Sequence, residues 1–407
     1  METMLKAKFS VDKTNWTLVK FGDVVFEPKE SSRDPVADGI EHVVGLEHIE
    51  PENIHLRNSA TLEEATTFTK KFAVGDVLFG RRRAYLRKAA KASFGGICSG
   101  DITVFRAKEN LMPELLPFIV NNEKFFDYAI KHSAGGLSPR VKFKDLANYQ
   151  FLLPPREQQV QLAKLLWAMD EVVERERELM EKLEYQSEVY LNKSFRYGAF
   201  LNQKSKNTYY GPIPENWELK KLEELGEFKN GINKDKDQFG FGRPFVNLMD
   251  AFGHKDLFFK EFDLVNATEG DLQLFNLTKG DVLFIRSSVK PSGVGLTTLI
   301  QEDFPNTVYS GFIIRFRPNN EELTQIFKKY CFYEERFRYS LIRRSTVSAN
   351  TNINQESLKR LVIPVPPLGE QLEFSRTLSQ YETIYNKLKL KISSSEALQK
   401  SLIKQVF

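Results

Sequence analysis

Residues 154–200 read PPREQQVQLAKLLWAMDEVVERERELMEKLEYQSEVYLNKSFRYGAF, and the organisation of the whole chain follows from them. After the Pro-Pro start, apolar residues recur at steps of three, four or seven, the pattern of a helix that packs along another helix. These seam positions are Leu162, Leu166, Met169, Val173, Met180, Leu183 and Tyr190. Glu176 and Ser187 fall on the same seam and weaken it. We predict one helix of about 40 residues, far longer than the usual 11–12.

A second stretch of the same design closes the chain. Residues 366–407 read PPLGEQLEFSRTLSQYETIYNKLKLKISSSEALQKSLIKQVF, again with a Pro-Pro start. Each long stretch follows a segment that mixes short β-type runs with Gly-rich turns. The predicted order is a globular domain over 1–153, a helix over 154–200, a second globular domain over 201–365 and a second helix over 366–407. The polar residues 202–216 are predicted to form a linker.

The two halves of the chain share short landmarks in the same order. The sequence GDVLF occurs at 75–79 and again at 280–284, each time followed two residues later by an arginine. The other matched pairs are Asn15-Trp16 with Asn216-Trp217, Ser99-Gly100 with Ser310-Gly311, Phe105-Arg106 with Phe316-Arg317, and Leu146 with Leu358. A repeat with a period near 200 residues indicates duplication of a whole domain, because solenoid repeats are much shorter.

These observations predict the fold class. Short connections favour antiparallel packing of neighbouring helices. We expect an α+β chain in which two homologous globular domains alternate with two long helices that pair as an antiparallel coiled coil. An approximate two-fold would then relate the halves and place the domains at opposite ends of one rod, which suits a target read in two separated parts.

Composition limits the class of protein. The 407 residues are 41% hydrophobic, enough for more than one core. There is no apolar run of membrane-spanning length and no apolar signal core near the N-terminus, so we expect a soluble, cytoplasmic protein. Cys98 and Cys331 are far apart and are expected to be buried apolar residues. Basic residues exceed acidic ones only slightly in each globular segment, 22 to 20 over 1–155 and 23 to 21 over 201–367. Any DNA contact must therefore come from local clusters.

Catalytic patterns are missing from the sequence. It contains no phosphate-binding loop of the GxxxxGK[ST] type. Its Pro-Pro sites lack the polar residue and the aromatic that an adenine methyltransferase uses to hold a flipped base. His42, His48 and His55 are spaced by six and seven residues, which fits no zinc site. We expect no catalytic residue, no metal and no cofactor in this chain.

The first candidate DNA contacts follow the GDVLF strands. Arginine can pair bidentately with guanine, while lysine and serine commonly hold phosphates. In the first domain the candidates are Arg81, Arg82, Arg83, Lys88 and Lys91, and in the second they are Arg286, Ser288 and Lys290. The alternative for each residue is a solvated loop at a strand end.

The second candidate contacts lie in a Gly-, Ser- and Asn-rich loop before the last strand of each domain. Such residues let backbone approach a partner closely, and asparagine can pair bidentately with adenine. The candidates are Ser138, Arg140 and Lys142 in the first domain and Arg343, Arg344, Asn350 and Asn352 in the second. A flexible surface connection is the alternative. Because the loops differ between the copies, they would read unlike half-sites.

In these residues the chain resembles the specificity subunit of type I restriction-modification systems. The resemblance covers nearly the whole length. It rests on the Trp-x-Leu starts at Trp16 and Trp217, on GDVLF in both copies, on PPREQ and PPLGEQ before the long helices, and on the GPIPENW restart.

The resemblance implies two target-recognition domains that read a bipartite, asymmetric site in double-stranded DNA, with the helices as spacer. It also implies two methyltransferase subunits, which would bind S-adenosylmethionine and carry the catalysis, and possible restriction subunits. The residues implied for partner binding are Pro154, Pro155, Glu157 and Gln158, matched with Pro366, Pro367, Glu370 and Gln371. In this alignment the first copy is one residue shorter.

Two other classes of function stay open at this point. One is a non-catalytic coiled-coil interaction scaffold that does not bind DNA sequence-specifically. The other is a self-contained nuclease or methyltransferase, which the missing motifs disfavour. The first is distinguished by whether neutralising the loop arginines weakens DNA binding.

Overall fold

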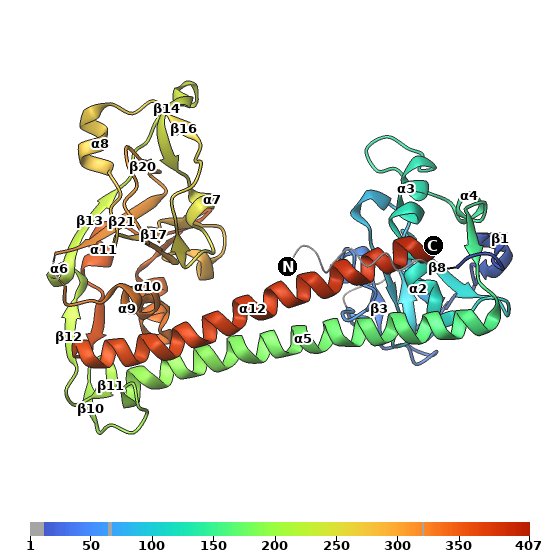
Figure 1. The fold of residues 1–407 in the computed structure, drawn as a ribbon, viewed down its shortest axis with the longest axis horizontal. Coiled ribbons are helices and arrows are strands. Elements are labelled where there is room, and N and C mark those ends of the chain that lie inside the picture. Colours follow the sequence, from blue (N-terminus) through green and yellow to red (C-terminus); the bar gives the residue numbers. More distant parts are fainter. Residues whose placement is uncertain (1–11, 64–66, 320) are drawn as a thin grey trace. The chain divides into compact units, whose positions relative to one another are not determined.

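The computed structural model describes residues 12–63, 67–319 and 321–407. Residues 1–11, which belong to the N-terminal stretch expected to lack a signal core, lie outside these ranges. The chain divides into two compact units, one made of residues 1–179 and 388–407 and the other of residues 180–387. Two long helices, α5 (Arg156–Tyr197) and α12 (Leu368–Val406), each contribute to both units (Figure 1).

The first unit is built on a four-stranded sheet with the order β2-β8-β5-β6. A three-stranded sheet, β3-β7-β4, and the antiparallel pair β1-β9 complete it. Its strands are β1 (Thr17–Lys20), β2 (Val25–Phe26), β3 (Val43–Val44), β4 (Lys70–Phe72), β5 (Val77–Gly80), β6 (Ala89–Lys91), β7 (Gly96–Cys98), β8 (Ile102–Ala107) and β9 (Gln150–Leu153). Its short helices are α1 (Phe21–Val24), α2 (Leu116–Val120), α3 (Glu123–Lys131) and α4 (Phe143–Leu146).

The core of this unit explains the GDVLF motif. All four residues of β5 are buried, because the strand lies inside its sheet between β8 and β6. Phe79 stacks on Phe105 with ring centroids 5.4 Å apart. Leu166 of α5 and Val406 of α12 are fully buried in the same cluster. The long helices are therefore part of the domain core, since they cover apolar surface that the sheet would otherwise expose.

The second unit repeats this plan with more strands. Its main sheet has the order β13-β21-β17-β19-β15, and β16-β14-β20, β18-β23-β22, β12-β24 and β10-β11 form smaller sheets. The strands are β10 (Ser205–Thr208), β11 (Gly211–Pro214), β12 (Glu218–Lys221), β13 (Gly226–Asn230), β14 (Phe239–Val246), β15 (Asp256–Leu257), β16 (Leu264–Val265), β17 (Val282–Ile285), β18 (Ser287–Ser288), β19 (Thr297–Ile300), β20 (Val308–Tyr309), β21 (Ile313–Pro318), β22 (Thr346–Val347), β23 (Thr351–Asn352) and β24 (Val362–Val365). The helices are α6 (Leu222–Leu225), α7 (Leu248–Ala251), α8 (Glu269–Phe275), α9 (Gln325–Tyr330), α10 (Glu335–Arg344) and α11 (Gln355–Lys359).

Strand pairing confirms the predicted duplication. The pair β1-β9 corresponds to β12-β24, and the order β2-β8-β5-β6 corresponds to β13-β21-β17-β19. In both units the aspartate of GDVLF is buried and accepts two hydrogen bonds from an arginine on the neighbouring strand. Arg106 donates to Asp76 at 2.7 and 2.8 Å, and Arg317 donates to Asp281 at 2.7 and 2.6 Å. The motif is therefore structural, because its charge is neutralised inside the protein.

The long helices pack antiparallel within each unit, as predicted (Figure 1). In the first unit Arg177 of α5 donates to Glu396 of α12 at 2.6 Å. In the second unit the ring of Tyr190 lies 6.2 Å from that of Tyr381. Of the seven predicted seam positions, Leu166 and Val173 are buried and the other five are half-buried. Glu176 is also buried there, with Lys391 Nζ 3.1 Å away.

Two further expectations can be compared with the structure. Residues 202–216, predicted as a linker, instead contain the hairpin β10-β11, and Ile213 of β11 is fully buried in the second core. The turn residues that suggested a linker serve this hairpin. Cys98 and Cys331 are free and buried, as expected. Within the described ranges, no helix has the length and apolarity needed to cross a bilayer.

Candidate nucleic-acid interface

In the first unit, backbone hydrogen bonds join the two loops that were singled out in the sequence. Arg81 N donates to Asp101 O at 3.0 Å, and Val141 N donates to Arg81 O at 3.0 Å. Arg83 N donates to Pro139 O at 2.8 Å. Arg83 has a left-handed backbone with a φ of 55°, which turns the chain sharply after β5. The structure thus brings Arg81–Arg83 beside Ser138 and Arg140, although about 57 residues separate them in the sequence.

Side chains of this cluster converge on Asp101. Arg140 Nε donates to Asp101 Oδ1 at 2.8 Å, and Arg82 Nη1 donates to Oδ2 at 3.2 Å. Arg82 Nη2 also donates to Ser138 Oγ at 3.1 Å, and Arg83 Nη2 reaches the same oxygen at 3.4 Å. Partial burial acts to raise the pKa of Asp101, but the hydrogen bonds from Arg140 and Arg82 outweigh it and hold the pKa below its usual value. Asp101 is a cluster residue that the sequence reasoning missed.

Three other candidates of the first domain lie outside this cluster. Lys88 Nζ donates to Leu46 O at 2.7 Å. Lys91 Nζ lies 4.6 Å from the ring centroid of Trp167 on α5, a cation–π contact inside the unit. Lys142 is exposed at the start of α4. The structure therefore gives Lys88 and Lys91 internal roles and separates them from the arginine cluster.

In the second unit the equivalent loops also come together. Arg286 N donates to Phe312 O at 2.9 Å, and Ile353 N donates to Arg286 O at 3.0 Å, which repeats the bonds around Arg81. The next residues form β18, which pairs with β23 so that Ser287 faces Asn352. Arg286 Nη1 donates to Gly311 O at 3.1 Å, so this side chain is partly occupied. Exposed candidates around this small sheet are Lys290, Arg343, Arg344 and Asn350.

The backbone register makes the two surfaces comparable residue by residue. In the first unit the backbone of Arg140 pairs with Arg82 and with Ala134. In the second unit the backbone of Asn352 pairs in the same way with Ser287 and with Thr346. Asp101 and Phe312 occupy the same place beside the arginine after the GDVLF strand. One position thus carries Arg140 in the first unit and Asn352 in the second. The same backbone presents different hydrogen-bonding groups.

The residues after each Pro-Pro pair make internal contacts. Gln371 is fully buried, and its amide accepts from Thr324 N at 2.8 Å and donates to Glu322 O and Pro366 O. Gln159 makes the same three bonds, to Met112 N, Asn110 O and Pro154 O. Because a buried amide needs its partners, these glutamines fix where the helices begin.

This geometry corrects the alignment of the two Pro-Pro motifs. Gln158 accepts a hydrogen bond from Trp16 Nε1 at 2.7 Å, and Glu370 accepts one from Trp217 Nε1 at 2.9 Å. Gln158 therefore corresponds to Glu370 and Gln159 to Gln371, with no residue missing in the first copy. The match of Glu157 with Glu370 and of Gln158 with Gln371 is wrong. That alignment matched the two Glu-Gln pairs by residue type. The equivalent positions are instead defined by the hydrogen bond to the tryptophan and by the buried glutamine amide.

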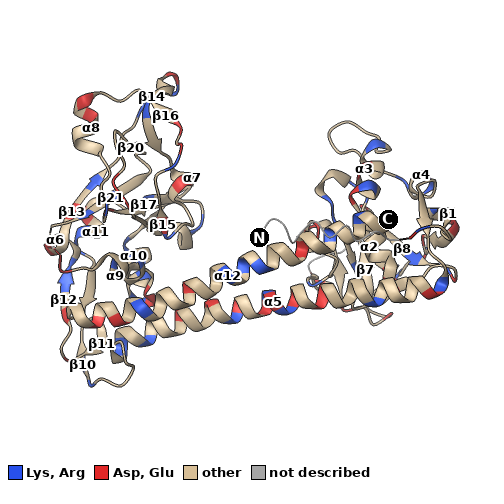
Figure 2. Cartoon of the chain, in the orientation of Figure 1, with Lys and Arg blue, Asp and Glu red and all other residues tan. Residues whose placement is uncertain are grey.

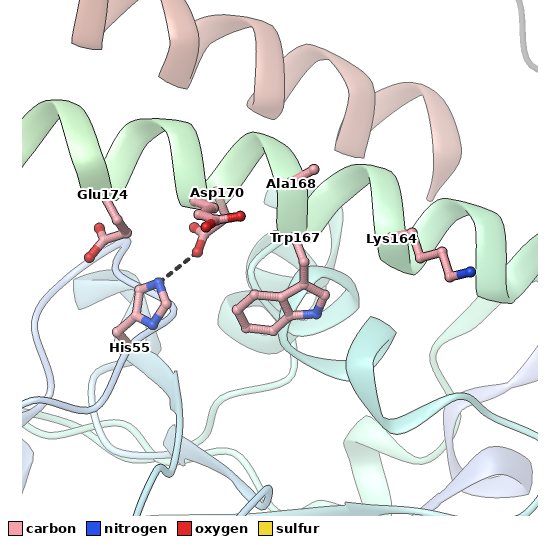
Figure 3. Close-up of a pocket in the computed structure, with 7 residues that line it drawn as sticks. His55, Lys164, Trp167, Ala168, Asp170 and Glu174 are labelled. Atoms are coloured by element: carbon pink, nitrogen blue, oxygen red, sulfur yellow. Dashed lines mark hydrogen bonds and ion pairs between the residues drawn. The ribbon is translucent and has the colours of Figure 1, made fainter.

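A hollow of about 540 Å³ lies along α5 in the first unit, where Figure 3 shows His55 facing Asp170 beside Trp167. His55 Nε2 lies 2.7 Å from the nearly buried Asp170 carboxylate, and Trp167 Nε1 donates to Glu114 O at 2.9 Å. The acidic residues Glu171 and Glu174 also line the hollow. In the described ranges no cluster of three or more His, Cys, Asp or Glu residues could hold a metal.

Comparison with known proteins decides the family. The family model described as the type I restriction modification DNA specificity domain matches residues 14–185 and 214–394. The chain belongs to this family. The two matched segments correspond to the two halves of the duplication, and membership of the type I specificity family confirms the prediction of a specificity subunit.

Relatives of known name agree with this membership. The MjaVIII type I specificity subunit of Methanocaldococcus jannaschii is 26% identical over 320 residues, covering 75% of this chain and 71% of the relative. The EcoKI specificity subunit of Escherichia coli is 22% identical over 330 residues, covering 78% and 68%. A protein described as the MjaX specificity subunit of M. jannaschii is 24% identical over 212 residues, and the match spans 51% of this chain and only 49% of that relative.

Solved structures share the fold of this type I family member. A chain from a structure on complex assembly and conformational transition of the type I R-M system has a TM-score of 0.60 at 21% identity and covers 97% of both chains. The S subunit of a type I system from M. genitalium has a TM-score of 0.53 at 14% identity and covers 98% of both chains. At these identities the likeness concerns the fold.

Proposed function

We propose that this chain is the DNA-reading subunit of a type I modification complex, with one half of a split, asymmetric double-stranded site read by each globular domain. We place the domains at residues 1–153 and 201–365 and the spacer helices at 154–200 and 366–407. The observation that carries the proposal is the shared loop backbone with unlike side chains, Arg82 and Arg140 in one copy against Ser287 and Asn352 in the other. Unlike groups on one scaffold suit unlike half-sites.

The proposed DNA-contacting residues are exposed or half-buried side chains of these loops. In the first domain we propose Arg83, Ser138 and Arg140 as the central group, braced by Arg82, with Arg81 and Lys142 at its edge. In the second domain we propose Arg286, Ser288, Lys290, Asn350 and Asn352, with Arg343 and Arg344 supplying positive charge at the end of α10. Lysine and arginine residues at these positions would hold phosphates and make DNA binding salt-dependent.

Catalysis belongs, in this proposal, to methyltransferase subunits that dock on this chain and bind S-adenosylmethionine, with restriction subunits as a further class of partner. A stripe on α5 suits such docking, because Leu165, Val172 and Leu179 recur every seven residues and are 40%, 47% and 55% exposed. Residues of both charge signs occur along α5 (Figure 2). The exposed residues Pro155, Glu157 and Pro367 extend the docking surface, as does a hollow of about 590 Å³ beside Pro366 and Leu368.

Reconstitution tests this function. The chain is combined with candidate type I methyltransferase subunits, and methylation of a random-sequence DNA library is read by sequencing. The proposal expects adenine methylation confined to one sequence with two separated parts. Methylation without sequence preference would contradict it and favour a scaffold that does not read DNA, whereas methyl transfer by the purified chain alone would make it an enzyme.

Docking is tested separately with Val172→Glu, which places a charge in the apolar stripe. Co-purification of the methyltransferase subunits should fall at least tenfold, because a buried unpaired charge is costly. The control is Glu171→Gln, at the neighbouring exposed position. Equal co-purification of both variants would exclude the stripe as the docking surface.

A further inference from the structure

The guanidinium of Arg140 is held from one side only. Its Nε donates to Asp101 at 2.8 Å, while Nη1 and Nη2 have no hydrogen-bond partner in the described part of the chain. The backbone is fixed as well, because Arg140 N donates to Ala134 O at 2.9 Å and Ala134 N donates to Arg140 O at 3.0 Å. The side chain is 46% exposed. A fixed arginine therefore offers two parallel N–H groups to solvent.

Arg82 differs from Arg140 in this respect. Both of its terminal nitrogens are bonded, Nη1 to Asp101 and Nη2 to Ser138, and its Nε is buried. Arg82 therefore braces Asp101 and Ser138 from the inside of the cluster. Of the arginines on Asp101, Arg140 alone has a free bidentate edge within the described residues.

We propose that Arg140 reads a guanine in the first half-site and that Asp101 is its positioning residue. The inference rests on the proposed function and specifies the ligand of one surface. Arginine pairs bidentately with O6 and N7 of guanine in the major groove. Fixing the guanidinium before binding reduces the side-chain entropy lost on contact.

The negative charge of Asp101 favours contact of Arg140 with a base over contact with a phosphate. A carboxylate bonded to the guanidinium repels a phosphate that approaches the same group, whereas the guanine edge offers neutral acceptors. The equivalent positions of the second unit hold no such pair, because Phe312 replaces Asp101 and Asn352 replaces Arg140. The requirement for guanine that Arg140 imposes should therefore fall in the first half-site only.

The test uses the reconstituted complex and the random-sequence library, with Arg140→Ala, Arg140→Lys, Asp101→Asn and Asp101→Glu. Arg140→Ala should reduce the preference for guanine at one position of the first half-site by roughly 10- to 100-fold, with the second half-site unchanged. Arg140→Lys should lose most of the same preference despite keeping the charge. Asp101→Asn should weaken it at that position only, and Asp101→Glu should restore part of it.

The matched control is Asp38→Asn, which alters another carboxylate paired with a cation in the same unit, since Lys71 Nζ lies 3.4 Å from Asp38. Its base preferences should equal those of the wild type. A uniform loss of methylation at all sequences with Arg140→Ala, with a salt slope smaller by about 1, would mean a phosphate contact and overturn the inference. Unchanged preference would overturn it as well and leave the proposed function standing, whereas a wild-type complex without preference would overturn both.

Discussion

The two globular units attach to the long helices at the same place with different chemistry. In the first unit Asp170 of α5 meets His55, and in the second unit Glu382 of α12, 212 residues later, meets Lys329 and Tyr330 of α9. Lys329 also pairs with Asp256. Asp256 lies beside β19 where His55 lies beside β6, so these two residues occupy equivalent positions. Both copies have an acidic residue at this position of the helix, but the residue that pairs with it is histidine in the first unit and lysine in the second. The two copies therefore share the position of the contact between domain and helix, while the domain residues that make the contact differ, as they do in the loops.

The largest expected effect comes from breaking these two contacts. Lys329→Ala leaves Asp256 and Glu382 without their shared cation in a site where the lysine is 8% exposed, so we expect the second unit to lose about 3–5 kcal/mol of unfolding free energy. His55→Ala removes one partner of Asp170 and should cost the first unit only about 1–2 kcal/mol. Urea unfolding followed by hydrogen exchange in each unit measures both. Lys359→Ala, from an exposed pair with Glu356, is the control; equal losses in the two units would contradict the comparison.

The glutamines after the Pro-Pro pairs should behave alike in the two copies. Gln371→Ala and Gln159→Ala each remove the three hydrogen bonds of a buried side-chain amide, and each should cost about 2 kcal/mol. Urea unfolding measures the loss for each variant. The exposed Gln405 supplies the control as Gln405→Ala. A loss in only one copy would show that the repeated hydrogen bonds differ in energy despite the same geometry.

Asn352→Ala tests the loop of the second domain against that of the first. Asparagine pairs bidentately with adenine, so the variant should lower the preference at one A·T pair of the second half-site by about tenfold. The first half-site should keep its preference. Sequencing of methylated library DNA gives both values, with Asn207→Ala on the exposed β10 strand as the control. A change in the first half-site would show that the loops do not act independently.

Glu176 gives a smaller effect of opposite sign. It is 3% exposed in the helix seam and both carboxylate oxygens lack hydrogen bonds, with Lys391 as its ion-pair partner. Replacing a buried ion by a well-packed apolar residue is often stabilising, so Glu176→Leu should raise the stability of the first unit by about 1 kcal/mol. The control Glu171→Leu, in an exposed pair with Arg175, should change little. A loss with Glu176→Leu would show that the pair contributes net stability.

The smallest effect is the response of the arginine cluster to acid. The pKa of Asp101 is lowered in the folded protein, so the ion pairs contribute stability above its ordinary value of about 3.9, and that contribution fades as the pH falls through the lowered pKa. Asp101→Asn should remove this part of the pH dependence. Thermal unfolding midpoints between pH 6 and pH 3 measure it, and parallel curves for the wild type and the variant would contradict it.

Prediction from sequence succeeded where the signal was local or repeated. The long helices, the duplication and the family follow from the apolar spacing after Pro154, from GDVLF in both copies and from the two Pro-Pro starts. It failed where two distant segments had to be placed together. Nothing near Lys91 in the sequence indicates its contact with Trp167, and nothing near Asp101 indicates its two arginines, because both depend on strand pairing and helix packing.

Two copies of an α+β domain, two long paired helices and a basic, polar loop on each copy could be predicted from the sequence alone, because periodicity and repetition are properties of the linear chain. The remaining features depend on how the chain folds. Folding separates Lys88 from Arg140 and places Asp101 against Arg140. It also buries the side-chain amide of Gln371 at the start of its helix. Hydrogen bonds depend on which groups meet in space at about 3 Å, and only the folded backbone brings residues 81, 101 and 140 to one place.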